Sequence, residues 1–184
     1  MGSLSRQRKV ARLEGGDLIT AYESTIYRLK VAQGFLEESS QDLQLGRWRS
    51  AVDNAQLAVE NSAKTVLSLV VPIGKTHNPA PQLRDILSKG HFSADIAEKI
   101  ERLAESAEQL GFDVHIQTDY GDETGRLTPW DLFDENDARQ AQSLTQESVD
   151  LAGGGSRARG CSRPSCTRAS ARGRARAGGV GAGG

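Results

Sequence analysis

The side chains best suited to chemistry in this sequence lie in three separate segments. Lys64 follows Glu60 by four residues in a predicted helix, so the two would be neighbours with the acid on the N-terminal side. His77 follows this helix, and Tyr120 and Arg126 precede the last predicted helix. Arginine can contact a phosphate with two hydrogen bonds, lysine adds a point charge, a tyrosine ring can stack on a base, and histidine can gain charge near neutral pH. Together these five side chains could hold a nucleotide or an RNA end.

Each of these residues also has a purely structural interpretation. Glu60 and Lys64 could form an intrahelical ion pair that stabilises the fold by only a few tenths of a kcal/mol. The Thr-His pair at Thr76 and His77 could simply cap and pack a turn. Trp48 continues an apolar helical pattern and is interpreted as a core residue rather than a surface for a base.

The sequence predicts no catalytic residue, no cofactor and no metal site. It contains no phosphate-binding glycine loop, nucleophile elbow, zinc-protease helix pattern or dinucleotide fingerprint. Cys161 and Cys166 lack the second pair of ligands that a zinc site needs. The acidic run at 131–137 lacks the glycine and terminal glutamate of a calcium loop, so it is interpreted as a solvated helix N-terminus.

The elements that must position these side chains are predicted helices. The clearest covers residues 47–71, where apolar or small residues recur at steps of three and four, namely Trp48, Val52, Ala55, Val59, Ser62, Val66 and Leu69. The other predicted helices are 17–45 with Asp17 as N-cap, 81–89, 93–110 and 135–151. Residues 112–134 are predicted as a long loop. The expected fold is all-α, an antiparallel up-and-down bundle of four to five helices with 47–71 at its centre.

Composition divides the 184 residues into a basic N-terminal segment (1–16), the bundle (17–152) and a Gly/Ala/Arg/Ser-rich tail (153–184) predicted to be disordered. The tail is either an arginine-rich arm for RNA or a dispensable extension. It carries seven arginines and no acid, which leaves 16 basic against 24 acidic side chains in residues 1–152. Such a body is poorly suited to duplex DNA. No apolar run is long enough to cross a bilayer and no signal peptide is visible, so a cytoplasmic protein without a membrane contact is expected.

The run from Gly46 to Leu67, GRWRSAVDNAQLAVENSAKTVL, resembles the second helix of HEPN domains. In that family a G-x-Y/W turn precedes an A-x-x-A-V/A-E-x-x-x-K pattern, which here is met by Ala55, Ala58, Val59, Glu60 and Lys64. The Thr-His segment that opens the third helix, and the loop with Tyr120 and Arg126 before the last helix, are similar to the family's further markers. The resemblance spans about residues 17–152.

This resemblance implies a helical bundle that binds a nucleotide or RNA, forms a homodimer, or pairs with a minimal nucleotidyltransferase. The family's ribonuclease motif, an arginine followed after four to six residues by a histidine, is absent at the matching position because no histidine follows Arg126. Arg84 and His91 have a similar spacing but lie in the wrong segment, so the protein is expected to bind rather than to cleave. An endoribonuclease toxin using Arg126 or Arg84 with one of the histidines, and a protein-interaction module without a ligand, are the alternatives.

Overall fold

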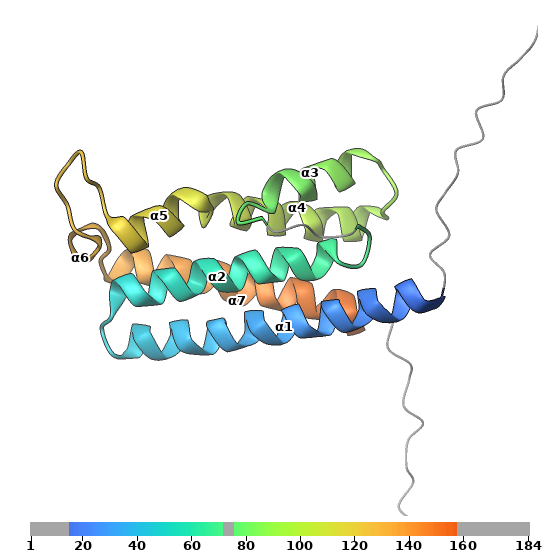
Figure 1. Cartoon of the computed structure of the whole chain (residues 1–184), viewed down its shortest axis with the longest axis horizontal. Coiled ribbons are helices and arrows are strands. Elements are labelled where there is room, and N and C mark those ends of the chain that lie inside the picture. The colour runs from blue at the N-terminus through green and yellow to red at the C-terminus, as the bar shows by residue number, and fades with distance from the viewer. Residues whose placement is uncertain (1–14, 72–75, 158–184) are drawn as a thin grey trace, which may run out of the picture.

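Seven helices account for most of the described part of the chain (Figure 1). The computed structural model describes residues 15–71 and 76–157, and the side chains of 21–71 and 76–154. The helices are α1 (Gly15–Gln44), α2 (Trp48–Leu67), α3 (Ala80–Ser88), α4 (Ala94–Gln109), α5 (Phe112–Tyr120), α6 (Pro129–Leu132) and α7 (Glu135–Arg157). Within these ranges an isolated bridge between Asp122 and Leu127 is the only β-type pairing. The predicted all-α bundle is therefore confirmed.

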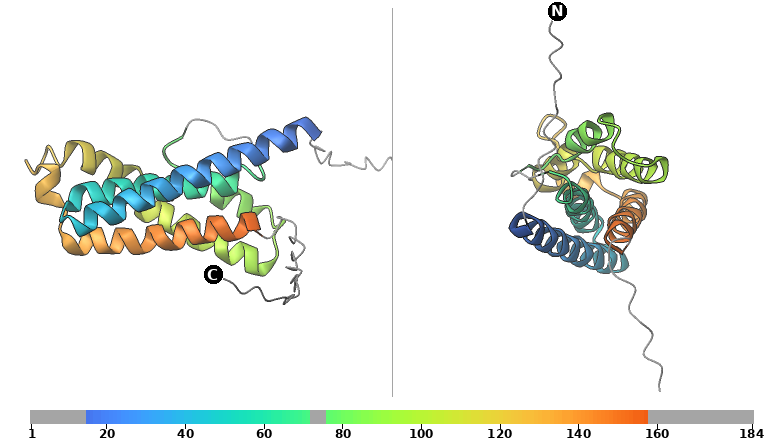
Figure 2. Two further views of the ribbon diagram at one scale, coloured as in Figure 1. Left: turned by 90° about the horizontal axis from the view of Figure 1, so that it is seen from below. Right: turned by 90° about the vertical axis from the view of Figure 1, so that its right-hand side faces the viewer.

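Helix α2 lies at the centre of the bundle, as its sequence pattern predicts. It packs against α1 and α7 on one side and against α3, α4, α5 and α6 elsewhere. In the end-on view α2 is surrounded by α1 below it, α7 to its right and the pair α3 and α4 above it (Figure 2). A helix surrounded in this way buries residues on most of its circumference, which explains why both apolar and charged α2 side chains are buried.

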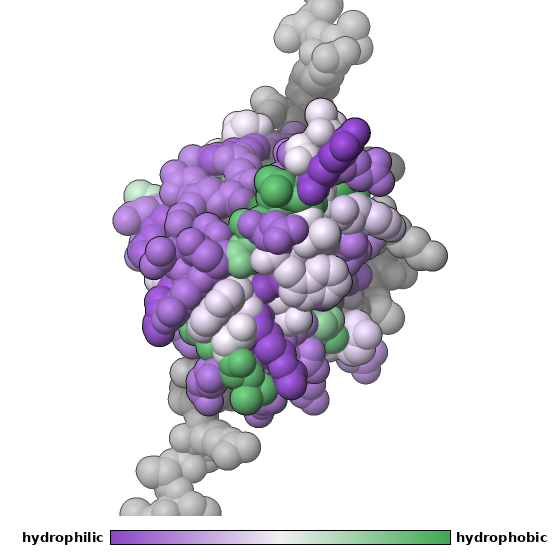
Figure 3. Space-filling view, turned by 90° about the vertical axis from the view of Figure 1, so that its left-hand side faces the viewer, coloured by the Kyte–Doolittle hydropathy of each residue, from purple (hydrophilic) through white to green (hydrophobic). Residues whose placement is uncertain are grey.

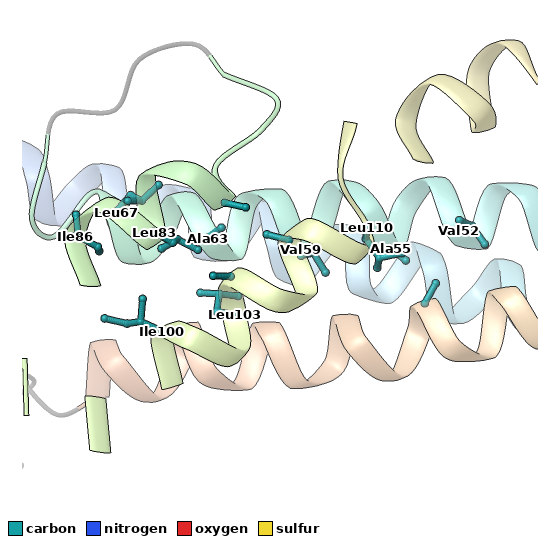
Figure 4. Packing of buried hydrophobic residues seen from close by; sticks show 14 of the residues in the cluster. Val52, Ala55, Val59, Ala63, Leu67, Leu83, Ile86, Ile100, Leu103 and Leu110 are labelled. Carbon is teal, nitrogen blue, oxygen red and sulfur yellow. The ribbon is translucent and has the colours of Figure 1, made fainter. Parts of the chain in front are cut away.

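One line of α2 residues forms the floor of the hydrophobic core. We call Val52, Ala55, Val59, Ala63 and Leu67 the apolar stripe. Their steps of three and four residues place them on one side of the helix, and none is more than 2% exposed. They meet Leu83 and Ile86 of α3, Ile100 and Leu103 of α4, and Leu110 (Figure 4).

Hydroxyl groups tie the long outer helices to the α2 backbone. Ser39 of α1 donates to the carbonyl of Ala51 at 2.8 Å, and Thr145 of α7 donates to the carbonyl of Ala55 at 3.2 Å. Both acceptors belong to fully buried alanines, which permit such close approach because they have no side chain beyond Cβ. The predicted separation of the first two helices at Gly46 is also confirmed, since this glycine has φ +69° in the turn between α1 and α2.

The helices differ from the predicted ones in four respects. α2 ends at Leu67, four residues before the predicted end at 71. α1 begins at Gly15, so Asp17 lies inside the helix and is not its N-cap. α7 continues through the glycines to Arg157, so the first five residues assigned to the tail are helical. The chain between 112 and 134 is not one loop, because it contains α5 and α6. The aromatic and glycine residues of this stretch obscured the helical spacing of Val114 and Thr118, which face the bundle.

The connection after α5 depends on a glycine. Gly121 has φ +75°, and a Cβ at this position would lie 2.3 Å from the carbonyl oxygen of Leu127. The loop then closes through two backbone hydrogen bonds between Asp122 and Leu127. α6 follows with a capping box in which Thr128 and Asp131 bond each other, and the hydrogen bonds from Thr128 hold the pKa of Asp131 below its usual value. This end of the molecule presents a mixed hydrophilic and apolar surface (Figure 3).

Some predicted features lie outside the described residues. These are the segment 1–14 and the tail from 158 onward with its two cysteines. Among the helices that the structure describes, none combines the length and apolar character needed to span a membrane.

Candidate functional site

A second line of α2 residues is polar and faces α5 and the segment before α3. We call Arg49, Asp53, Gln56, Glu60 and Lys64 the polar stripe. Four of its members directly follow a member of the apolar stripe in sequence, so the two stripes are rotated by about 100° around the helix. The polar stripe carries charges of both signs, with Arg49 and Lys64 at its two ends and the two carboxylates between them.

Glu60 and Lys64 form a buried pair within the polar stripe. The Lys64 Nζ lies 2.5 Å from Glu60 Oε1, and Lys64 and Glu60 are only 7% and 5% exposed. The side-chain amide of Gln56 donates to the other carboxylate oxygen at 3.3 Å. The predicted ion pair is therefore present but buried, so removing one partner would leave an uncompensated charge. Because Lys64 is neutralised by Glu60, it is not a free cation for a ligand.

His77 lies next to this pair, although it belongs to the segment between α2 and α3. Its Nδ1 is 3.5 Å from Glu60 Oε2, while its side chain remains 64% exposed. The local turn is held by Thr76, whose hydroxyl oxygen accepts a hydrogen bond from the backbone N–H of Asn78 at 3.1 Å. The buried Pro79 then leads into α3. The Thr-His pair thus forms a local turn but does not cap α3, whose N-cap is Pro79 without a side-chain cap hydrogen bond, and the turn leaves His77 beside Glu60.

The His77 ring stacks on His115, which sits on α5. The two ring centroids are 5.7 Å apart and the planes differ by 6°. His115 is more buried than His77, with 26% of its side chain exposed, and its Nε2 lies 3.8 Å from Asp119 Oδ2. The Nδ1 of His115 is buried without a hydrogen-bond partner. The resulting pair has one inner ring, His115, and one outer ring, His77, whose side chain is largely exposed to solvent.

Helix α5 is held in place by the N-terminal part of the polar stripe. Arg49 Nε donates to the carbonyl oxygen of Thr118 at 2.6 Å, and the Thr118 hydroxyl donates to Asp53 at 3.1 Å. The same guanidinium lies 3.4 Å from Asp53 and 3.3 Å from Asp119. These bonds fix α5 against α2 and so place His115 where its ring stacks on that of His77.

Of the residues that the structure brings together here, the sequence predicts Glu60, Lys64 and His77 but not His115 or Arg49. His115 is not predicted because its helix is expected to be a loop. One feature of the sequence does point to such contacts. Polar residues recur at 49, 53, 56, 60 and 64, and on a helix at the centre of a bundle such a line must face polar groups of neighbouring elements.

Tyr120 and Arg126 do not join the other three predicted residues. Tyr120 is the last residue of α5 and is 65% exposed, and Arg126 lies in the loop that follows, with φ 56°. This loop and α6 occupy one end of the bundle, beyond the first turn of α2, while Lys64 lies in the last turn of α2 (Figure 1). No hydrogen bond, ion pair or ring contact between described residues connects either one to Glu60, Lys64 or His77. A single pocket built from all five is therefore not formed.

Arg84 is committed to a different contact. Its guanidinium donates to both carboxylate oxygens of Glu108 at 2.9 Å and also contacts Glu101. The hydrogen bond with Glu108, and then that with Glu101, raise the pKa of Arg84, and the same guanidinium lowers the pKa of Glu108. His91 is exposed in the turn between α3 and α4. Arg84 is thus a structural residue that joins α3 to α4.

An apolar groove with a volume of about 990 Å³ lies on a different side of the bundle from the histidines. It lies between α4 and α7, next to the C-terminal end of α2 and the residues that follow it, with Val66, Leu69, Ile96, Ile100 and Leu151 among its lining residues. None of the residues of the histidine site lines it. The polar site and this groove are therefore separate features.

Comparison with known proteins gives two likenesses. A family model described as HEPN domain matches residues 26–153, a range that includes all of the polar stripe, both stacked histidines and the loop with Arg126. Among solved structures, the crystal structure of TT1696 from Thermus thermophilus is similar, with a TM-score of 0.52 and 19% identity over 71% of this chain and 96% of that chain. This second likeness supports the fold. A comparison with curated proteins finds no match. Since the family model covers well over half of the sequence, the chain belongs to the HEPN family.

Proposed function

We propose that this HEPN protein binds a nucleotide or single-stranded RNA at the stacked histidines, without cleaving it. The observation that carries the proposal is the outer ring of the stack. His77 is 64% exposed, lies parallel to His115 and is backed by the buried carboxylate of Glu60. Unpaired bases bind to proteins largely by stacking on aromatic and histidine rings. A base on the free face of His77 would extend the existing two-ring stack.

The surroundings favour binding over cleavage. The two arginines that could have supported a ribonuclease site are elsewhere, since Arg84 is bonded to Glu101 and Glu108 and Arg126 lies in the end loop. Arg49 is the arginine whose contacts reach the histidine site, and it already contacts Asp53, Thr118 and Asp119. A site that cleaves RNA needs a cation that can stabilise the charge developing on the phosphate. Arg84 and Arg49 are already paired with carboxylates and Arg126 lies in the end loop, so none of the three supports cleavage at the histidines.

The test uses the full chain and a fluorescently labelled 20-nucleotide RNA of mixed sequence. Binding is measured by anisotropy, and the RNA is then run on a denaturing gel. His77→Ala should weaken binding about 5-fold or more, because one base-to-ring stack contributes roughly 1–3 kcal/mol. His91→Ala is the matched control, since His91 is exposed and lies outside the site.

Each other outcome points elsewhere. Equal weakening by both variants, or by neither, would remove the histidine stack as the binding site. Cleavage that disappears in His77→Ala would favour the endoribonuclease. Absence of both binding and cleavage would favour an interaction module. Homodimer formation and pairing with a minimal nucleotidyltransferase remain predictions from the family, and sedimentation of the purified chain would check the first.

A further inference from the structure

The end of the bundle formed by α6 and the loop before it exposes large apolar side chains that the histidine site does not use. Trp130 is 75% exposed, and Tyr120 and Leu127 are exposed as well. The two backbone hydrogen bonds between Asp122 and Leu127 close the loop and bring its two ends together. We call Tyr120, Leu127 and Trp130 the aromatic end; Figure 3 views the molecule from this side.

The backbone beneath Trp130 is fixed by local contacts. The buried Pro129 opens α6, and Thr128 and Asp131 on either side bond each other in the capping box. A partner that covers a ring on such a backbone has little backbone entropy to remove. Exposed aromatic side chains of this kind are typical of interaction surfaces.

Negative charge surrounds the aromatic end. Residues 120–137 contain one cation, Arg126, and six carboxylates, namely Asp122, Glu123, Asp131, Asp134, Glu135 and Asp137. Among the described residues, Glu135 is the one member of this set with a cationic partner, which is Arg139. The surface therefore suits a cationic partner. Arginine fits best, because its planar guanidinium stacks on aromatic rings and also pairs with carboxylates.

The sequence itself supplies such a partner in its C-terminal tail. Residues 158–184, which lie outside the described residues, contain six arginines and no acidic residue. Four of these arginines fall within nine residues, at 168, 172, 174 and 176. The tail therefore carries the charge that the aromatic end lacks.

The length of the tail lets these arginines reach the aromatic end of the same molecule. α7 begins beside α6 and ends at the opposite end of the bundle (Figure 1). Its 23 residues span about 34 Å, at 1.5 Å per residue. Counted from Arg157, an extended chain carries Arg172 about 50 Å but Arg163 only about 20 Å. Attachment within one chain also raises the effective concentration of the two surfaces.

We propose that residues 168–176 dock on the aromatic end of their own chain. One arginine stacks on Trp130, and the others pair with the carboxylates around it. This inference goes beyond the proposed function and does not involve the histidines. A docked tail keeps these arginines from other anions, so the aromatic end controls whether the tail is available.

The experiment places a spin label in the tail and detects its approach to Trp130. Cys161 and Cys166 are the only cysteines in the sequence, so Cys161→Ser in the full chain leaves Cys166 for a nitroxide label. NMR spectra then compare the indole N–H of Trp130 with the backbone N–H of His91, in the turn between α3 and α4 at the opposite end (Figure 1). The label should broaden the Trp130 signal more than that of His91 at about 0.05 M salt. The broadening should disappear at about 0.5 M, because exposed charges are then screened.

Two double variants test which arginines dock. Arg172→Gln with Arg174→Gln should lower the docking equilibrium constant about fivefold or more, since each arginine contact with an exposed ring or carboxylate contributes roughly 2- to 5-fold. Arg159→Gln with Arg163→Gln removes the same charge from the part of the tail that is too short to reach, so it should leave the broadening unchanged. Trp130→Ala, followed at the backbone N–H of Glu123, should weaken docking and leave the fold intact because the ring is exposed.

Three results would overturn the proposal. Absence of broadening at low salt would show that the tail does not dock, and an equal loss in both double variants would show that residues 168–176 are not the docking segment. Broadening of isotope-labelled chains by a spin label carried on unlabelled chains would show docking on a second molecule instead. Each of these results leaves RNA binding at the histidines unaffected.

Discussion

The apolar and polar stripes of α2 lie side by side on one helix but are stabilised in different ways. The apolar stripe packs against side chains of α3 and α4 and makes contacts that depend on volume. The polar stripe meets α5 and His77 through specific pairs, in which each charge has a named partner. Replacing one residue of the apolar stripe should cost stability in proportion to the volume removed. Replacing one charged residue of the polar stripe leaves its partner buried without a counter-charge, so both partners must be replaced together.

The largest effect should follow from removing one member of the buried pair. Glu60→Ala leaves Lys64 buried without its partner, so we expect a loss of about 3–5 kcal/mol in the free energy of unfolding, measured by urea denaturation. The double variant Glu60→Leu with Lys64→Met fills the space without charge and should recover most of that loss. A single variant as stable as the wild type would show that the pair contributes little and that the two stripes do not differ in this way.

A slightly smaller loss is expected from the apolar stripe. Leu67, the last residue of α2, is fully buried next to α3 (Figure 4). Leu67→Ala should therefore lower the free energy of unfolding by about 2–5 kcal/mol, through lost apolar burial and the cavity that remains. RNA affinity of the folded fraction should be unchanged, because Leu67 belongs to the apolar stripe, whereas Glu60, which contacts His77, belongs to the polar stripe. Ile96→Ala on α4 is the control, since Ile96 is 45% exposed and should cost only about 0.5 kcal/mol. A change in RNA affinity for Leu67→Ala would mean that the stripes are coupled.

The smallest effect belongs to an exposed ion pair outside both stripes. Arg84→Gln removes the partner of Glu108, whose carboxylate is 48% exposed, so solvent screening limits the loss to less than about 1 kcal/mol. Arg84 lowers the pKa of Glu108 from its usual 4.5 in the folded protein. The stability that the ion pair contributes is therefore fully present above pH 4.5, the usual pKa of a glutamate. It is lost as the pH falls through the lowered pKa of Glu108 in the folded protein. Urea midpoints of wild type and variant should converge as the pH is lowered from about 5 to about 2, and a constant difference would contradict the assignment.

Much of the fold could be predicted because helical periodicity is local. The apolar spacing of residues 47–71 placed α2 correctly at the centre, and Gly46 correctly separated it from α1. Helix α5 could not be predicted in this way. It is nine residues long, and it is held by Arg49 and Asp53 from more than sixty residues earlier in the chain. Such a short helix owes its stability to tertiary contacts that no local pattern reports.

The sequence by itself determined the helical architecture, the family and the Glu60–Lys64 pair, because residues four apart in a helix must be neighbours whatever surrounds them. Only the tertiary structure decided that His77 stacks on His115 and that Tyr120 and Arg126 lie at the far end of the bundle. Those relations depend on where His77 and α5 are placed against α2. Contacts between distant segments are set by the packing of whole elements, which spacing along the chain does not encode.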